Sequence, residues 1–246
     1  MRKFLFISLI LSSVSVNPLK SQVWIDFGVK GGLGASFLMN ANVWNDRASV
    51  HKLTGANSYG AKFGLNLGMK SELTVDYMFS KYAQNMQINN DDGIFEMQFG
   101  IRSTEVPILY RLNGDEGSYL EVGGAFGQVR GAFESGDLSS PVAPINYYER
   151  NYKSAVFGFG SYVLGAENVY LAMGLRFSYV FTDVISVEGG KNTTNYYPTQ
   201  NNYAPSPAFL EYKPTTPFSA LFMIEINYDL GYLARAACGR TAIMLF

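Results

Sequence analysis

The stretch Tyr59-Gly-Ala-Lys-Phe-Gly-Leu-Asn-Leu-Gly-Met69 decides the fold, because its residues divide cleanly into two faces. The odd-numbered positions are all apolar, whereas the even-numbered positions hold only glycine, lysine and asparagine. Side chains alternate across a β-strand, so the stretch predicts a strand with one large apolar face and one polar or bare face. The two faces of this strand must meet different environments.

Seven further segments between Val23 and Leu230 repeat this period of two, so we expect eight strands. The fourth segment changes phase, because its apolar residues are odd-numbered as far as Ile101 and even-numbered from Val106 onward. One extra residue moves every following side chain to the other face of a strand. The sequence therefore predicts a β-bulge near Ser103-Thr104.

The links between these segments alternate in length. Short links follow the second, fourth and sixth segments at residues 70–71, 113–117 and 165–168. Long polar links follow the first, third, fifth and seventh segments at residues 40–58, 83–94, 131–153 and 183–216. An up-and-down barrel places alternate links at opposite rims, and outer-membrane barrels have short periplasmic turns and long extracellular loops. The alternation predicts an eight-stranded antiparallel transmembrane β-barrel with this orientation.

A soluble β-sandwich or a lipocalin-type barrel would show the same period. Such a fold would have to bury the charged faces of the strands and expose the apolar faces, which inverts the usual preference. Lipid around the barrel removes this conflict. Eight strands close around a lumen that side chains can fill, and an unpaired buried charge is costly. We therefore expect a paired polar network in the lumen, made of Asp26, Lys30, Lys62, Asp76, Glu96, Arg102, Arg111, Glu121, Arg176 and Glu225.

Composition excludes several other classes of protein. The formal net charge of -1 argues against a nucleic-acid-binding face, which needs a basic excess. Cys238 is the only cysteine, so neither a disulfide framework nor a cysteine-based metal site is expected. The basic residues Arg2 and Lys3 precede a short apolar stretch that is typical of a secretory signal peptide. The expected organisation is a signal peptide at 1–22, the barrel at 23–230 and a periplasmic tail at 231–246.

Three segments also carry a family resemblance: Glu105-Val-Pro-Ile-Leu-Tyr-Arg-Leu112, the strand that begins at Tyr119, and the hairpin from Ala155 to Asp183. They resemble the outer-membrane β-barrel domain family of Bacteroidota, which is similar to small OmpA-type and OmpX-type barrels of the porin family. The resemblance covers residues 23–230. It implies a barrel in the outer membrane of a Gram-negative bacterium, and some relatives assist secretion or gliding. The chain departs from the pattern in its tail, since such barrels usually end on the last strand.

Evidence for catalysis in the sequence is slight. The only histidine is His51, in the first long link, and a lone loop histidine is usually a solvated side chain. Small outer-membrane barrels include enzymes that modify lipid A, so such an enzyme using His51 is one alternative, and a small-solute channel is another. No cluster has metal-ligand spacing, and no cofactor is expected. A catalytic Ser–His pair would also need an orienting acid.

The long links are richer in potential binding residues. Tyrosine combined with asparagine and serine gives broad contact area and adaptable hydrogen bonding. The candidate recognition residues are Tyr147, Tyr148, Tyr152, Tyr196, Tyr197 and Tyr203. Such links can equally be polar caps. We expect a non-enzymatic barrel with a structural, adhesive or envelope- or secretion-complex accessory role. Its expected partners are outer-membrane lipid and lipopolysaccharide, with other envelope or secretion proteins as further candidates.

Overall fold

The computed structural model describes residues 23–45, 49–90, 93–136, 145–166, 168–192, 211–237 and 240–242. The predicted signal peptide at 1–22 and the candidate residues Tyr196, Tyr197 and Tyr203 lie outside these ranges. No helix in this described part of the chain is long and apolar enough to cross a membrane.

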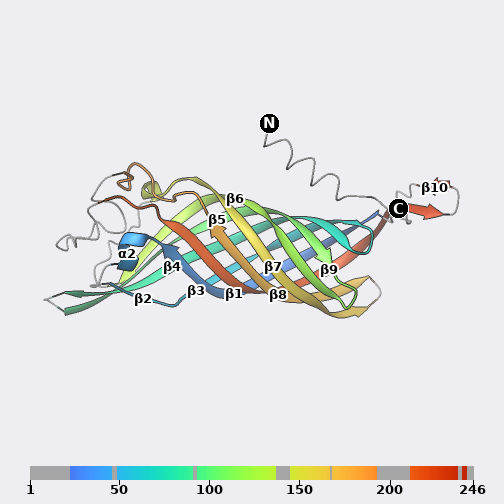
Figure 1. The fold of residues 1–246 in the computed structure, drawn as a ribbon, viewed down its shortest axis with the longest axis horizontal. Helices are drawn as coiled ribbons and strands as arrows, with labels where there is room; N and C mark the ends of the chain where they lie inside the picture. Colours follow the sequence, from blue (N-terminus) through green and yellow to red (C-terminus); the bar gives the residue numbers. More distant parts are fainter. Residues whose placement is uncertain are drawn as a thin grey trace, which may run out of the picture.

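Eight antiparallel strands form a closed barrel (Figure 1). Neighbours along the chain pair in turn, and β1 pairs with β9 from Val23↔Ala234 to Met39↔Thr216, which closes the ring. The strands of the ring are β1 (Val23–Met39), β3 (Thr54–Leu67), β4 (Ser71–Asn90), β5 (Gly93–Asn113), β6 (Ser118–Gly136), β7 (Asn151–Ala166), β8 (Val169–Val180) and β9 (Thr216–Ala237). The predicted up-and-down barrel of eight strands is confirmed.

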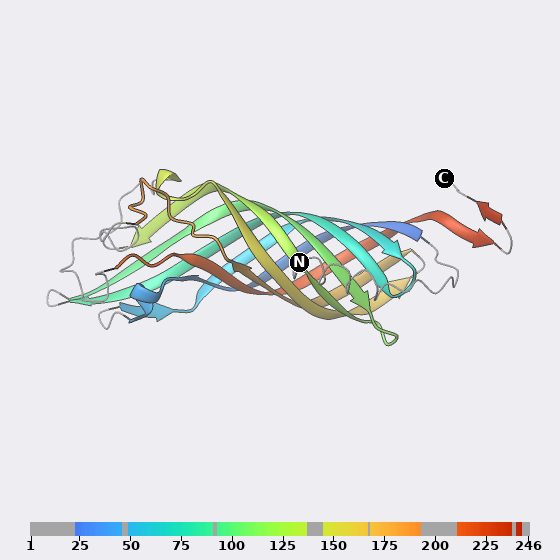
Figure 2. The same cartoon turned by 45° about the horizontal axis from the view of Figure 1, so that its top comes forward.

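Four smaller elements accompany the ring. The helix α2 (Ala41–Asn45) and the strand β2 (Ser49–Lys52) lie between β1 and β3, and β2 pairs with β4. The 3-10 helix η1 (Ile145–Tyr147) precedes β7. The strand β10 (Arg240–Ala242) pairs with the end of β9, beyond the end of the barrel that lies opposite α2 and β2 (Figure 2). The tail expected at 231–246 therefore contributes to β9 as far as Ala237.

The links fall at opposite ends of the barrel as their lengths predict (Figure 1). The short connections at one end join Leu67 to Ser71, Asn113 to Ser118 and Ala166 to Val169. The long link predicted at 83–94 is a paired β-hairpin and not an irregular loop, because β4 and β5 continue to pair as far as Asn90↔Gly93. These two strands extend well past the rim as a hairpin. The chain between β1 and β3 is also partly regular, since α2 and β2 occupy it.

A register shift does lie next to the predicted position, between Arg102 and Ser103 in the pairing of β5 with β6, but it does not move the side chains of β5 to the other face. β4 and β5 keep one register from Val75↔Ile108 to Lys81↔Arg102, so β5 does not change phase. The register shift lies in β6, where Arg102 pairs with Gly131 and Ser103 pairs with Val129. The apolar pattern of β5 changes because its lumen-facing residues change from apolar to polar along the strand, while its faces stay the same.

The outer surface of the barrel is apolar. Large side chains on every strand of the ring are 39–54% exposed, including Val29, Phe63, Val75, Ile108, Val122, Phe157, Leu175 and Ile224. A closed barrel satisfies all strand hydrogen bonds internally and can therefore cross hydrocarbon. The apolar exterior, the filled polar interior and the segregated turns are the features of outer-membrane barrels. The protein is an integral transmembrane β-barrel of the outer-membrane type.

Candidate functional site

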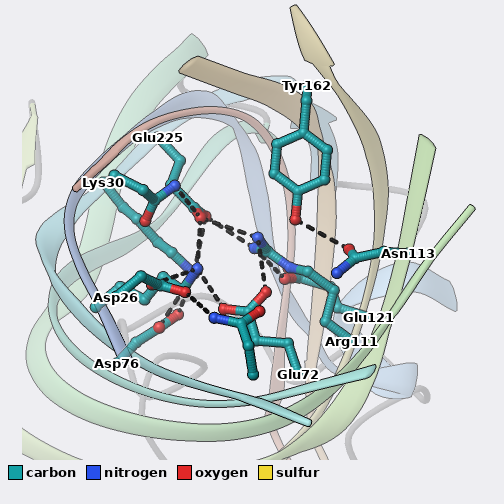
Figure 3. Close-up of polar contacts among 12 residues, drawn as sticks. Asp26, Lys30, Glu72, Asp76, Arg111, Asn113, Glu121, Tyr162 and Glu225 are labelled. Carbon is teal, nitrogen blue, oxygen red and sulfur yellow. Dashed lines mark hydrogen bonds and ion pairs between the residues drawn. The ribbon is translucent and has the colours of Figure 1, made fainter. Parts of the chain in front are cut away.

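A network of buried ion pairs lies in the lumen (Figure 3). It is on the side of the short turns, since Asp26 is close to the start of β1 and Glu72 is close to the start of β4. Seven strands contribute to it, and β7 provides only glycines at this level. Eight of the ten residues predicted for the network lie in it, and Glu72 joins them: Asp26, Lys30, Lys62, Glu72, Asp76, Arg111, Glu121, Arg176 and Glu225. Each of these residues is no more than 7% exposed.

Glu225 on β9 is the centre of the network. Its carboxylate accepts hydrogen bonds from both terminal nitrogens of Arg111, at 2.9 and 2.8 Å. The ammonium groups of Lys30 and Lys62 each lie 3.1 Å from its oxygens. Asn227 donates a further hydrogen bond of 2.6 Å to the same carboxylate. Three cations from three other strands therefore converge on one anion, which ties the closing strand β9 to the rest of the barrel.

The network continues across the lumen to β6 and β8. Arg111 Nη2 lies 3.0 Å from Glu121, and Arg176 Nε lies 2.7 Å from the other oxygen of Glu121. Arg176 also contacts Asp76 at 3.0 Å, and Asp76 accepts hydrogen bonds from Lys30. Charge-assisted hydrogen bonds of this length are the strong kind. Every cation in the network contacts at least two carboxylates, as complete pairing of buried charge requires.

Glycines give these long side chains their space. A Cβ on Gly64 of β3 would lie 2.5 Å from carboxylate oxygens of both Asp26 and Glu72. A Cβ on Gly158 of β7 would lie 2.7 Å from Glu121. The bare lumen faces of these strands therefore hold the carboxylates of their neighbours. This arrangement explains why glycine alternates with apolar residues in the stretch that decides the fold.

Two predicted network residues lie elsewhere. Glu96 is on the outward face of the β4–β5 hairpin and forms an exposed ion pair with Lys52. Arg102 is exposed on the outer face of β5, and its guanidinium lies over the ring of Phe133. Both assignments followed from the phase change expected in β5. Because β5 keeps its register, the even-numbered positions face outward along its whole length.

Glu105 lies just beyond the ion network and has a different environment. Its carboxylate is 6% exposed and accepts hydrogen bonds from Ser80, Tyr82 and Tyr152 at 2.6, 2.8 and 2.9 Å. A cavity of about 20 Å³ beside it is also lined by Ser80, Tyr82 and Arg176. Three hydroxyl donors, rather than a cation, therefore compensate this buried carboxylate.

An apolar plug fills the lumen on the side of the long links. We use this name for the cluster of Leu38, Val43, Tyr82, Met86, Met97, Phe99, Ile101, Val129, Tyr148, Tyr152, Val180, Val184 and Ile185. All of these residues are 5% exposed or less. A bridge between Tyr148 and Ile185 joins the third and fourth long links inside the mouth. The extracellular end of the lumen is therefore closed by packed side chains.

The plug corrects the prediction of a tyrosine recognition surface for two of its six residues, and Tyr196, Tyr197 and Tyr203 lie outside the described residues. Tyr148 and Tyr152 are 4% and 3% exposed, because both side chains pack into the lumen. Tyr147 is half-buried against the same cluster. Sequence reasoning missed the plug because apolar lumen residues resemble lipid-facing ones. One signal was available in the sequence. Met97, Phe99 and Ile101 have odd numbers, like the lumen residue Arg111 on the same strand, so an uninterrupted strand places them on the same face.

At the periplasmic end the lumen opens into a vestibule of about 410 Å³. Trp24, Tyr162 and Tyr170 line its walls with Asn66 and Asp229. Asn66 donates a hydrogen bond of 2.6 Å to Asp26 of the ion network. The vestibule therefore ends at the network, and the network and the plug lie between it and the other end of the barrel.

His51 lies in β2, on the extracellular side. Its Nε2 is 3.1 Å from the carbonyl oxygen of Val43, and its ring lies beside that of Trp44 with 5.6 Å between centroids. Neither partner is a nucleophile or an orienting acid of the kind that a catalytic histidine requires. Across the described ranges, no group of histidine, cysteine, aspartate and glutamate residues has the geometry to hold a metal ion.

Comparisons with known proteins give distant structural likenesses only. No protein-family model matches the chain, and no curated protein matches it. Neisserial surface protein A is 11% identical, with a TM-score of 0.40 over 83% of this chain and 97% of that one. The outer membrane protein OprG of Pseudomonas aeruginosa is 11% identical, with a TM-score of 0.39 over 86% and 97%. The outer membrane protease OmpT of Escherichia coli is 12% identical, with a TM-score of 0.29 over 88% and 99%.

Proposed function

We propose that the protein is a non-enzymatic, non-conducting outer-membrane barrel that holds its extracellular region on a rigid base. Its role is structural, adhesive, or accessory to an envelope or secretion complex, and it acts through the long loops. The observation that carries this proposal is the filled lumen. Ion pairs occupy one half and the apolar plug occupies the other, so the barrel supports its loops from within.

The region beyond the membrane supports the same role. β4 and β5 continue past the lipid-facing belt, and their outward side chains become polar at Asn85, Gln87 and Gln98. Two of their inward side chains, Met86 and Met97, are buried in the plug. The plug therefore holds the inner face of this hairpin against the end of the barrel. Rigid elements position binding groups more accurately than free loops.

Single-channel recording in planar lipid bilayers tests the non-conducting part of the proposal. Purified full-length protein should give no stable channels, because ions would have to cross both the network and the plug. Detergent buffer without protein is the control for bilayer leakage. Large and stable conductance steps from the folded protein would contradict the proposal and favour a small-solute channel.

A loop deletion tests whether the barrel acts through its long loops. Residues 193–204 carry the asparagine- and tyrosine-rich sequence of the fourth long link. Replacing them with a short Gly-Ser linker should reduce adhesion of whole cells, or the recovery of envelope proteins that co-purify with the barrel. Surface labelling must show equal amounts of both proteins. Unchanged adhesion and unchanged co-purification would favour loops that serve as polar caps.

The enzymatic alternative rests on His51 alone. The surroundings of His51 do not favour this alternative, because its Nε2 contacts a backbone carbonyl oxygen and its ring contacts Trp44. The lipid A mass spectrum of a His51→Ala strain tests this alternative. We expect a spectrum identical to that of the parent strain. A loss of acyl chains or phosphate groups relative to the parent would instead assign an activity to this histidine.

Two finer proposals concern origin and processing. We propose that residues 1–22 are a cleaved signal peptide, and that the chain is a small barrel of the OmpA-like type found in Bacteroidota. The basic start, the short apolar stretch and the barrel motifs at 105–112 and 119–124 support them. N-terminal sequencing of the protein from outer membranes should begin near Gln22.

A further inference from the structure

Four basic residues lie on the outward face of four adjacent strands, at the extracellular edge of the lipid-facing belt. Each lies one or two outward positions beyond a large apolar residue of the lipid-facing belt on its own strand, such as Phe79 on β4 or Phe126 on β6. The four residues, in strand order from β4 to β7, are Lys81, Arg102, Arg130 and Lys153. Lys81 and Arg102 are directly paired across β4 and β5. We call these four residues the basic belt.

Aromatic rings hold part of the basic belt in place. Phe133 of β6 lies across Gly100 of β5, where an added Cβ would come within 2.7 Å of the ring. Lys81 Nζ lies 4.7 Å from the centroid of this ring, and Arg102 Cζ lies 5.7 Å from it. Lys153 Nζ lies 6.0 Å from the centroid of Phe126. Cation–π contacts of this kind position the charged groups while leaving them open to solvent and to headgroups.

The basic belt also lacks compensating charge. None of its four residues forms an ion pair with a carboxylate in the described parts of the chain, whereas Lys52, Lys70, Lys191 and Lys213 each do. Arg130 donates a hydrogen bond of 3.3 Å to the neutral hydroxyl of Thr104. At the same edge, the outward residues of the other strands are uncharged, for example Phe181, Phe218 and Phe37. The positive charge is therefore confined to one side of the barrel.

We propose that the basic belt binds the phosphate groups of a phosphorylated glycolipid of the outer leaflet, the lipid A class. The belt lies where the headgroups of that leaflet meet the hydrocarbon. Its four cations complement phosphate, and arginine and lysine are the usual residues for phosphate binding. Phe79, Val106 and Phe126 lie directly below on β4, β5 and β6 and provide an apolar wall for acyl chains. One lipid can therefore contact charge and apolar surface together.

Native mass spectrometry of the full-length protein in detergent tests this site. The probe is hexa-acylated lipid A with two phosphates, titrated against the wild type and against a variant with Lys81→Gln, Arg102→Gln, Arg130→Gln and Lys153→Gln. Each cation near a membrane surface contributes about fivefold to the binding of an anionic headgroup. We expect single substitutions to weaken binding about fivefold each and the quadruple variant to weaken it by more than about fiftyfold.

The matched control removes four lysines that already have carboxylate partners, as Lys52→Gln, Lys70→Gln, Lys191→Gln and Lys213→Gln. It changes the net charge of the protein equally and should bind lipid A like the wild type. Heat-modifiable gel mobility confirms that both quadruple variants are folded barrels. Equal loss in both variants would overturn the proposal, because the effect would then follow net charge.

Two further lipids identify the group that is recognised. Lipid A from which both phosphates have been removed should lose the binding that the wild type shows, and its retention would overturn a phosphate site. Phosphatidylglycerol, which has one phosphate and no sugar, should bind at least tenfold more weakly than lipid A. Equal binding of phosphatidylglycerol would overturn the assignment to a glycolipid, because any anionic lipid would then suffice.

Discussion

The two halves of the lumen are filled by opposite chemistries. The periplasmic half holds nine charged residues in one ion network, and the extracellular half holds the apolar plug. Both exclude a continuous water path, but the loss of one side chain destabilises each half for a different reason. A buried ion pair that loses one partner leaves an uncompensated charge, whereas a plug that loses a side chain leaves a cavity whose lining can partly relax. Substitutions in the two halves should therefore lower the free energy of unfolding by different amounts.

The largest effect is expected for Arg111→Ala. The substitution leaves Glu225 and Glu121 without their guanidinium contacts in a site that is 0% exposed at Arg111. Breaking one side of a buried charge network costs about 4 kcal/mol. Urea unfolding in lipid vesicles, followed by tryptophan fluorescence, measures the change. Lys70→Ala breaks only the exposed pair with Asp115 and should cost less than about 1 kcal/mol. An equal loss of unfolding free energy in the two variants would show that the network does not stabilise the barrel more than an exposed ion pair does.

The next effect is expected in the plug. Phe99 is 1% exposed and packs in the apolar plug. Phe99→Ala should lower the free energy of unfolding by about 3 kcal/mol through lost burial and a residual cavity. Phe157→Ala is the matched control, since that side chain is 44% exposed toward lipid. If Phe157→Ala lowered the free energy of unfolding as much as Phe99→Ala, the plug would be no better packed than the lipid-facing surface.

A third test compares the inner and outer faces of one strand pair. Gly64→Ala forces a methyl group against Asp26 and Glu72 and should cost about 2 kcal/mol as overpacking. Gly31→Ala is the control, because a Cβ there has no neighbour within 4 Å. The same urea titration applies to both. If Gly64→Ala proved as well tolerated as Gly31→Ala, glycine would not be needed to make room for the network.

The smallest effect is expected where the two halves meet. Tyr152 belongs to the plug, yet its hydroxyl group donates to Glu105 and lies 2.6 Å from Ser103. Tyr152→Phe keeps the ring and removes one of three donors to a buried carboxylate, so it should cost about 1.5 kcal/mol. Tyr59→Phe, on the exposed outer face, controls for loss of a hydroxyl. A neutral result at 152 would show that the remaining donors satisfy Glu105.

Much of the barrel follows from local pattern. The period of two, the glycines opposite apolar residues and the alternating link lengths predict the strand number and the orientation. They also place residues such as Lys62 and Glu225 in the lumen. These predictions hold because alternation across a strand is a property of the backbone itself. Which carboxylate meets which cation does not follow, since the ten expected residues allow many pairings and the structure chooses one.

The sequence by itself determined that this chain is a closed barrel with charges inside and apolar side chains outside. Only the tertiary structure decided that the extracellular half of the lumen is apolar, that Glu96 and Arg102 face outward, and that Tyr148 and Tyr152 are buried. The physical reason is that lipid and a packed interior attract the same side chains. An apolar residue on a barrel strand therefore does not reveal its face until its register with the neighbouring strands is known.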